Sequence, residues 1–110
     1  MVKGLRMSMI VSPDRLRRVL LYLISATRGG PVRGVIIAAL KDEPMNANQL
    51  AQRLGYDYST IKHHLDVLME NKLVEPVGGR YGQLYFLSSV LQENYADFLE
   101  ILGKIGKKQT

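Results

Sequence analysis

The chain is 110 residues long, with 46% hydrophobic and 23% charged residues, and this composition suits one folded domain rather than a disordered chain. It contains no cysteine, which excludes disulfide bonds, thiolate metal sites and a cysteine nucleophile. The formal net charge of +5 favours an anionic partner such as nucleic acid, although a soluble surface without such a partner gives the same charge.

No segment has the features of a membrane span or of a signal peptide. The longest apolar run, residues 19–24, is far shorter than the ~20 residues that a spanning helix needs. Residues 1–15 have no convincing apolar stretch and no small-residue cleavage site. Together with the absence of cysteine, these features predict a cytoplasmic protein without a membrane partner.

Basic residues are concentrated at the start of the chain. Residues 1–41 hold eight Lys or Arg and one acidic residue, whereas residues 46–87 hold four of each. The basic excess therefore lies outside the segment that carries the adjacent histidines His63 and His64, and the charge distribution alone assigns no role to it.

Residues 1–11 show no clear periodicity and predict a flexible arm, followed by a single domain over residues 12–110. A first helix begins with Ser12 as its N-cap and Pro13 at the first helical position. Apolar residues then recur at helical spacing. They are Leu16, Val19, Leu20, Leu23 and Ile24.

The sequence TRGGP at residues 27–31 ends this helix and starts a second one, which runs from about residue 31 to 41. A third helix begins at Asn46, because Gln49 lies three residues later and completes a capping-box pattern. Gly55 suits the left-handed position that ends a helix.

A fourth helix over residues 58–71 follows Asp57, which is placed to cap it. Ile61, Leu65 and Leu68 have helical spacing and predict its buried face. Two short helices joined by a turn that contains glycine form a candidate helix-turn-helix.

Two short apolar segments then predict a β-hairpin, namely LVEPV at residues 73–77 and QLYFL at residues 83–87. The turn between them, GGRYG, has a basic and an aromatic residue at its tip. A final helix is predicted from Ser89, with Gln92 at capping-box spacing, to near Leu102.

The final helix carries an apolar seam at heptad spacing, which an unpartnered helix would expose to aggregation. We therefore predict a homodimer formed by the first and last helices, the alternative being that both helices fold back onto their own domain. The predicted interface residues are Leu16, Leu20, Leu23, Leu91, Tyr95, Phe98 and Leu102.

Residues 46–88 resemble the ArsR-type branch of the winged helix-turn-helix transcription regulators of bacteria and archaea, most strongly at STIKHHLDVLMENKLVE. The resemblance implies a mainly α fold with a small β-hairpin wing and a DNA-binding core at about residues 31–88. It also implies a homodimeric regulator that binds double-stranded DNA sequence-specifically. Metal-sensing members carry a cysteine pair that this chain lacks, so no metal site or cofactor is carried over, and an effector ligand is left open.

The helix over residues 58–71 corresponds to the recognition helix of that family, whose first turn enters the major groove. Lys62 and His63 fall on its exposed side and can contact a phosphate or guanine, whereas His64 lies nearer the buried side and is expected to bond a backbone group. Adjacent histidines point about 100° apart on a helix and are poorly arranged to share a metal.

Further contacts are expected from the wing and from the preceding helix. Arg80 at the hairpin tip can reach the minor groove or the backbone, although a soluble turn with one arginine is the plain alternative. Arg53 can bind a phosphate or simply be solvated. The predicted DNA contacts are Asn48, Tyr58, Ser59, Thr60, Lys62, His63, Arg80, Tyr81 and Gln83.

Three other classes of function are considered beside DNA regulation, namely protein–protein interaction, RNA binding and catalysis. Winged helices also serve as protein–protein interaction modules, and the neutral charge of residues 46–87 is compatible with that use. RNA binding is disfavoured because exposed aromatic residues for base stacking are few. The sequence offers no nucleophile–base pair, phosphate-binding glycine loop or metal-ligand spacing, so no enzymatic activity is predicted.

Overall fold

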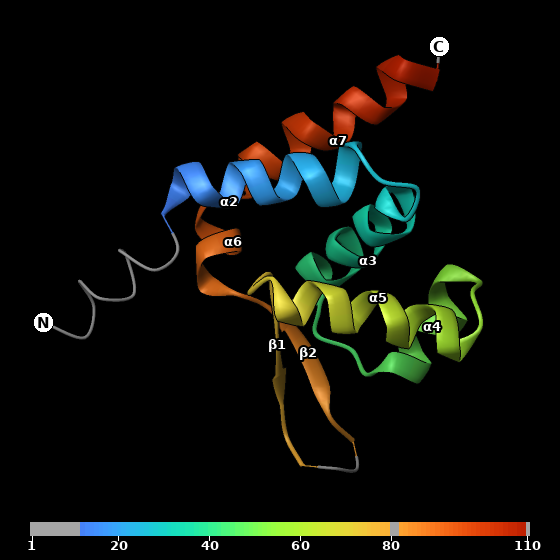
Figure 1. The fold of residues 1–110 in the computed structure, drawn as a ribbon. Coiled ribbons are helices and arrows are strands. Elements are labelled where there is room, and N and C mark those ends of the chain that lie inside the picture. The colour runs from blue at the N-terminus through green and yellow to red at the C-terminus, as the bar shows by residue number, and fades with distance from the viewer. Residues whose placement is uncertain (1–11, 80–81, 110) are drawn as a thin grey trace, which may run out of the picture.

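The computed structural model describes residues 12–79 and 82–109, and the side chains of residues 12–79 and 82–105 (Figure 1). The helical elements are α2 (Pro13–Leu20), the π-helix η1 (Leu21–Ser25), α3 (Gly30–Asp42), α4 (Ala47–Leu54), α5 (Tyr58–Glu70), α6 (Ser89–Glu93) and α7 (Tyr95–Gln109). The strands are β1 (Val74–Val77) and β2 (Leu84–Leu87). This order confirms a mainly α fold with a hairpin after the helices, as in a winged helix-turn-helix.

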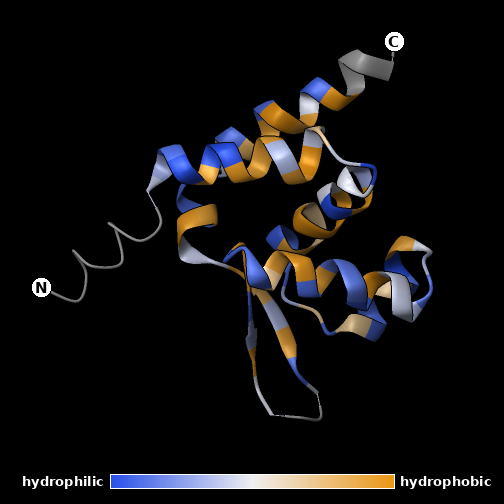
Figure 2. Ribbon diagram, viewed as in Figure 1, coloured by the Kyte–Doolittle hydropathy of each residue, from blue (hydrophilic) through white to orange (hydrophobic). Residues whose placement is uncertain are grey.

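The helices enclose one hydrophobic core. α2 packs beside α7 at the end of the molecule opposite the hairpin, and α3 contacts η1, α4, α5 and β2 (Figure 1). Hydrophobic and hydrophilic residues alternate along α2, α5 and α7, as amphipathic helices require (Figure 2). The largest fully buried side chains are Phe98, Leu16, Leu20, Ile24, Ile36, Ile37, Leu50, Ile61, Leu65, Leu68, Leu73 and Leu91.

The first helix begins as the sequence predicts but ends in a wider turn. The Ser12 Oγ accepts a hydrogen bond from the Arg15 backbone N–H at 3.2 Å, and Pro13 is the first helical residue. After Leu20 the chain continues as the π-helix η1, in which the Ser25 hydroxyl donates to the Leu21 carbonyl at 2.6 Å. The sequence did not predict this π turn, and π turns are frequent at functional sites.

The hairpin is anchored at its base to the turn between α3 and α4. β1 and β2 are antiparallel, with Val74 opposite Leu87 and Val77 opposite Leu84. The Tyr85 N–H donates to the Met45 carbonyl at 2.9 Å, so a bridge outside the hairpin pairs with β2. This pairing fixes the base of the hairpin against the helices, and β1 and β2 extend away from them (Figure 1).

The C-terminal region differs from the prediction in three ways. The N-cap is Ser88 rather than Ser89, since the Ser88 Oγ accepts from the Leu91 N–H at 3.4 Å. The helix breaks at Asn94 into α6 and α7. α7 then continues past Gly103 to Gln109, because packing of its apolar side outweighs the low helix propensity of glycine.

Most of the residues assigned to a dimer interface are covered by the chain itself. Leu16, Leu20, Leu23, Leu91 and Phe98 are buried in the core of the single chain, and Tyr95 and Leu102 pack against that core. The expectation that the seam would lie exposed is therefore wrong, because α2, η1 and α7 fold onto their own domain. The homodimer itself stays a prediction and requires other residues. Large exposed apolar side chains near these helices are Tyr22, Val35 and Leu99.

Within the described residues, no helix combines the length and the apolar character that crossing a bilayer demands. The same part of the chain contains no group of three or more His, Asp or Glu side chains arranged to hold a metal ion.

Candidate nucleic-acid interface

The turn between α4 and α5 is specified by local sequence. The Asn46 Oδ1 accepts from the Gln49 N–H at 2.7 Å, and the Gln49 Oε1 accepts from the Asn46 N–H at 2.8 Å, which confirms the predicted capping box. Gly55 has a φ of +79°, the left-handed conformation that glycine adopts without strain. These residues end α4 and turn the chain into α5.

Asp57 precedes α5 as predicted, but its carboxylate does not accept from the backbone of the helix. It accepts instead from the hydroxyl of Thr60 at 2.8 Å and from that of Ser59 at 3.5 Å. Both hydroxyl protons are thus directed at Asp57, which leaves oxygen lone pairs for any other partner. A carboxylate at the N-cap of α5 also disfavours a phosphate close by.

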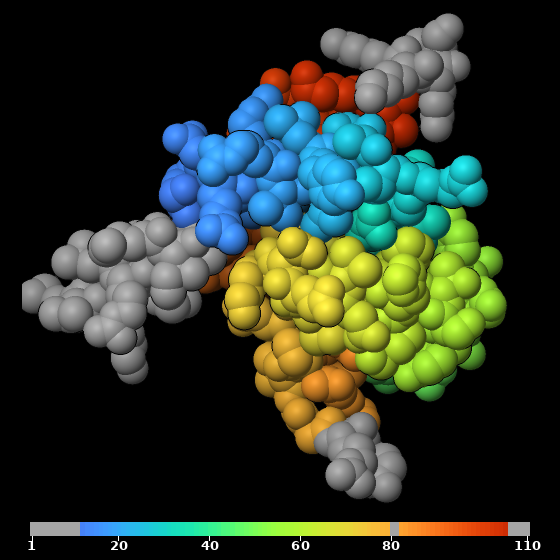
Figure 3. Space-filling view, viewed as in Figure 1, coloured from blue at the N-terminus to red at the C-terminus, as the bar shows by residue number. Residues whose placement is uncertain are grey.

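The two faces of α5 are those that the sequence predicts. Ile61, Leu65 and Leu68 are fully buried, whereas His63 is exposed and Lys62 is half-exposed. In the space-filling view α5 lies on the surface between α2 and the hairpin (Figure 3). The helix is therefore held by its apolar side and presents its polar side to solvent.

A hollow of about 320 Å³ lies where α4, α5 and the hairpin meet. It brings together four of the predicted contacts, from the start of α4, the start of α5 and the end of the hairpin turn. They are Asn48, Tyr58, Lys62 and Gln83. The other lining residues are Asn46, Ala47, Gly82 and Tyr85. Three separate elements thus place donor groups around one concave surface.

The remaining predicted contacts lie elsewhere. Ser59 and His63 are exposed on α5, and Thr60 is half-buried, but none of the three lines the hollow. Arg80 and Tyr81, at the predicted tip of the wing, lie outside the described residues. The hollow therefore unites part of the predicted set, while the rest of α5 extends the same polar side.

Lys62 has a partner within its own helix. Its Nζ lies 2.8 Å from Asp66 Oδ1, and this hydrogen bond raises the pKa of Lys62 above its ordinary value. The spacing of four residues on a helix permits such a pair, so the sequence contained a signal for it that was not among the predictions. The ammonium group is consequently partly neutralised before any ligand arrives.

Tyr85 is a wall of the hollow that the sequence analysis did not assign to the site. Only 3% of this residue is exposed, and burial raises the pKa of its phenol. Its place on the inward side of β2 follows from the alternation of side chains along a strand, since Tyr85 and Leu87 are buried and Leu84 and Phe86 are half-buried. Tyr85 therefore contributes shape to the hollow more than accessible charge.

Arg53, considered above as a phosphate contact, also has an acidic partner. Its Nη2 lies 3.3 Å from Asp42 Oδ2, and both side chains are largely exposed. An exposed pair of this kind exchanges readily with solvent. The guanidinium is therefore accessible, but its charge is balanced locally.

The adjacent histidines have different environments. Their ring centroids lie 5.1 Å apart at an interplanar angle of 63°, and only His63 is exposed. His64 is 8% exposed, which confirms a structural position, but the expected backbone partner is wrong. Its Nδ1 bonds the guanidinium of Arg33 at 3.0 Å, a residue that is 31 positions away and so carried no signal in the local sequence.

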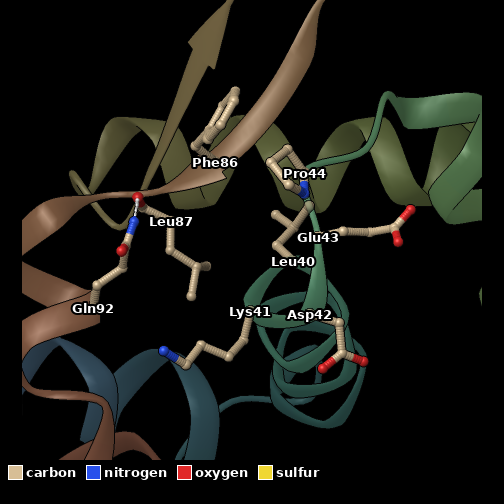
Figure 4. Close-up of a pocket in the computed structure, with 8 residues that line it drawn as sticks. All are labelled: Leu40, Lys41, Asp42, Glu43, Pro44, Phe86, Leu87 and Gln92. Carbon is tan, nitrogen blue, oxygen red and sulfur yellow. Dashed lines mark hydrogen bonds between the residues drawn. The ribbon is translucent and has the colours of Figure 1, made fainter.

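A second hollow, of about 200 Å³, lies between the end of α3, β2 and α6 (Figure 4). Leu40, Phe86 and Leu87 supply apolar surface, and the carboxylates of Asp42 and Glu43 stand at its side. Lys41 also lines this hollow, but the two carboxylates leave its lining net negative, which disfavours a nucleic-acid backbone there. The first hollow, which lacks an acidic lining residue, is therefore the better candidate for an anionic ligand.

Comparison with known families agrees with this architecture. A family model described as a helix-turn-helix domain matches residues 14–77, more than half of the chain. The chain belongs to this helix-turn-helix family. The match runs from α2 to β1, and the hairpin after the helices corresponds to the wing of a winged helix-turn-helix.

Solved structures share the winged helix-turn-helix fold at low sequence identity. HlyU from Vibrio cholerae N16961 is 23% identical with a TM-score of 0.60, over 84% of this chain and 97% of that one. RV1404 from Mycobacterium tuberculosis is 17% identical with a TM-score of 0.59, over 99% and 80%. A Listeria innocua Clip11262 protein described as of unknown function is 16% identical with a TM-score of 0.60, over 97% and 77%. No curated protein matches the chain.

Proposed function

We propose that this helix-turn-helix protein is a cytoplasmic transcription regulator that binds double-stranded DNA sequence-specifically as a homodimer. α5 is the recognition helix and enters the major groove, and the wing contacts the backbone or the minor groove. The DNA-binding core is residues 31–88, and the helices on either side of it serve in dimerisation; residues 1–11, expected from the sequence to form an arm, lie outside the described residues. The proposal assigns no enzymatic step and no cofactor to the chain.

One observation supports this proposal above the others. Asn48, Tyr58, Lys62 and Gln83 come from three elements and surround one hollow beside the exposed side of α5. Amide, phenol and ammonium groups are donors suited to phosphate oxygens and base edges. In this reading Lys62 and Asn48 bind phosphate, and Ser59, Thr60 and His63 face the groove.

Arg80, Tyr81 and Gln83 are proposed as the contacts of the wing. The base of the hairpin is fixed to the turn between α3 and α4 by the bond between Tyr85 and Met45. A basic residue in such a tip is attracted to the negative potential of a narrow minor groove.

We further propose that the chain is of the ArsR type in its architecture but not in thiolate metal sensing, since it has no cysteine. The dimer is assigned to η1 and α7, which pack against each other and expose Tyr22 and Leu99 at 63% and 53%. Sedimentation velocity at micromolar concentration tests it. A dimer is expected, Leu99→Glu is expected to be monomeric, and a parent protein that stays monomeric on DNA contradicts the assignment.

The experiment that tests DNA binding is a mobility shift on random duplex DNA at several salt concentrations. The logarithm of affinity is expected to fall linearly with the logarithm of salt, by about 0.9 for each neutralised phosphate. Selection of bound duplexes followed by sequencing should then yield a consensus with two-fold symmetry. Binding that is absent, or independent of salt, would contradict the proposal.

An interaction module for another protein is the alternative, favoured by one feature. Lys62 and Arg53 are each paired with a carboxylate, and the segment from α4 to the wing is close to neutral. A protein partner would be retained in a pull-down at salt concentrations that abolish DNA binding.

A further inference from the structure

Arg33 is a buried cation that the proposed DNA contacts do not use. It lies on α3, is 6% exposed, and among the described residues forms no ion pair with a carboxylate. Burial lowers its pKa, because the charged guanidinium loses hydration. A buried charge without a counter-ion is costly unless its N–H groups are bonded, so the partners of Arg33 are informative.

Those partners join two distant parts of the chain. The Arg33 Nε donates to the Leu23 carbonyl in η1 at 3.1 Å, and its Nη2 donates to the Thr27 hydroxyl just after η1. Its Nη1 lies 3.0 Å from His64 Nδ1 on α5. The guanidinium therefore connects the end of η1 to the buried side of the helix whose exposed side carries Lys62.

The bond to His64 requires a neutral imidazole. Since a guanidinium only donates, His64 Nδ1 accepts and the ring proton is on Nε2. Protonating Nδ1 would remove the acceptor and place two cations 3.0 Å apart. Burial lowers the pKa of His64, and the positive charge of Arg33 and then His63 lower it further.

Gly29 leaves the space that this bond occupies. A Cβ added at Gly29 would lie 2.7 Å from Arg33 Nη1 and 2.7 Å from His64 Cε1. The backbone there, with φ −79° and ψ 1°, is open to any residue, so only the side chains of Arg33 and His64 oppose an alanine. The pair and the glycine are thus matched in shape.

We propose that Arg33 and His64 are positioning residues for the recognition helix, whose bond holds α5 against the end of η1 in the orientation that DNA requires, and that protonation of His64 breaks this bond and lowers DNA affinity in acid. The inference rests on the proposed DNA binding. Among the described residues, the ionisable groups that act electrostatically on the pair are His63 on α5, which acts on His64, and Tyr22 on η1, which acts on Arg33.

The test compares DNA affinity from about pH 7.5 to about pH 5.5, the range in which an ordinary histidine titrates. It uses a His63→Gln background, because His63 is itself a proposed DNA contact and its contribution must be separated from that of His64. All proteins are studied at a temperature where circular dichroism shows them folded, so that loss of stability is separated from loss of position.

Two variants remove the bond. His64→Leu has no acceptor and Arg33→Met has no donor, and each is expected to weaken binding at neutral pH by about tenfold, the loss that corresponds to one hydrogen bond to a charged group. Because both remove the same bond, the double variant should bind no more weakly than either single variant. Gly29→Ala should weaken binding in the same direction, and Gly103→Ala, where a Cβ meets nothing, is its matched control.

One variant keeps the bond and removes the titration. The Oδ1 of His64→Asn can accept from Arg33 near the position of Nδ1, so this protein should bind within about twofold of its background at neutral pH. Its affinity should not change in acid, whereas that of the background falls.

The outcomes separate the two proposals. If the parent protein does not bind DNA, the proposed function fails. If it binds but His64→Leu and Arg33→Met bind equally well, or His64→Asn loses affinity in acid as its background does, the positioning role is overturned. Variants that lose thermal stability alone, with unchanged affinity and an unchanged pH profile, show that the pair is only structural.

Discussion

The helices that flank the domain and the helices that face the proposed ligand use charge in opposite ways. At the flanking end, Arg17 of α2 lies 3.2 Å from Asp97 and 3.1 Å from Glu100 of α7, so its charge ties two helices together. On α5, Lys62 is paired only with Asp66 of the same helix, one turn away. An external anion can replace that partner without separating any elements.

This difference shows why the distribution of charge along a sequence is a poor map of a binding surface. The basic excess lies in residues 1–41, yet Arg17 serves an interhelical contact there and Arg33 is buried. The segment from α4 to the wing is close to neutral, yet its exposed groups surround the hollow. For binding an anion, whether a charged side chain is exposed and can exchange its partner matters more than the net charge of its segment.

The sharpest test of the flanking end uses two neighbours on α7. Phe98 is fully buried, so Phe98→Ala should lower the free energy of unfolding by about 3–5 kcal/mol through lost burial and a cavity. Leu99 is 53% exposed in the single chain, so at a concentration where the protein is monomeric Leu99→Ala should change the free energy of unfolding by no more than about 0.5 kcal/mol. Urea denaturation measures both. Equal effects would mean that α7 does not pack as described.

The pair on α5 offers the next largest effect. Lys62→Ala should weaken DNA binding about tenfold and flatten the salt dependence by about one unit, as expected for a lost contact. Asp66→Asn removes the carboxylate that neutralises Lys62, so it should strengthen binding by a few-fold. Titration of fluorescent duplex DNA measures both. The two variants must change DNA affinity in opposite directions. Weaker binding by both would show that Asp66 orders Lys62 for binding.

Stability in acid distinguishes α5 from the flanking helices. The folded-state pKa of His64 is lowered below its ordinary value of 6.5, so the unfolded chain binds more protons at mildly acidic pH. Stability should therefore decrease as pH falls through about 6.5, which we expect to lower Tm by roughly a few degrees. His64→Asn should show a flatter Tm profile across this range. If His64→Asn shows the same dependence of Tm on pH as the parent protein, His64 does not cause the loss of stability in acid.

The smallest effect is expected from the ion pair of the flanking end. The hydrogen bond from Arg17 lowers the pKa of Glu100, so any stabilisation is present above the ordinary value of 4.5 and is lost as pH falls further. Arg17→Gln should lower Tm only slightly, and the difference should vanish in about 1 M salt because exposed pairs are screened. A large, salt-independent loss would indicate a structural role beyond charge.

Much of the fold followed from local signals. The capping box of Asn46 and Gln49, the glycine at residue 55 and the apolar spacing of α5 each depend on residues within one or two turns. Such signals predict a helix-turn-helix from sequence because they do not depend on tertiary contacts. They also place the exposed side of α5, and with it Lys62 and His63.

The features that were missed depend on distant contacts. Ser88 and Ser89 are equally good caps in sequence, but the Ser88 N–H donates to the Leu73 carbonyl at 2.9 Å, which sets where β2 ends and α6 begins. α7 passes Gly103 because Ile101 and its neighbours pack on the core. The bond between Arg33 and His64 spans 31 residues and follows from no periodicity.

Gly30 illustrates how such distant packing would appear in a genetic experiment. A Cβ at this position would overlap the carbonyl oxygen of Ile24, so the start of α3 meets the end of η1 with no room for a side chain. In a saturation screen scored by reporter expression, every substitution at residue 30 would give a null phenotype like that of a lost operator contact. An invariant glycine there would record the crossing of two helices, and only a stability readout would distinguish it from the residues that touch DNA.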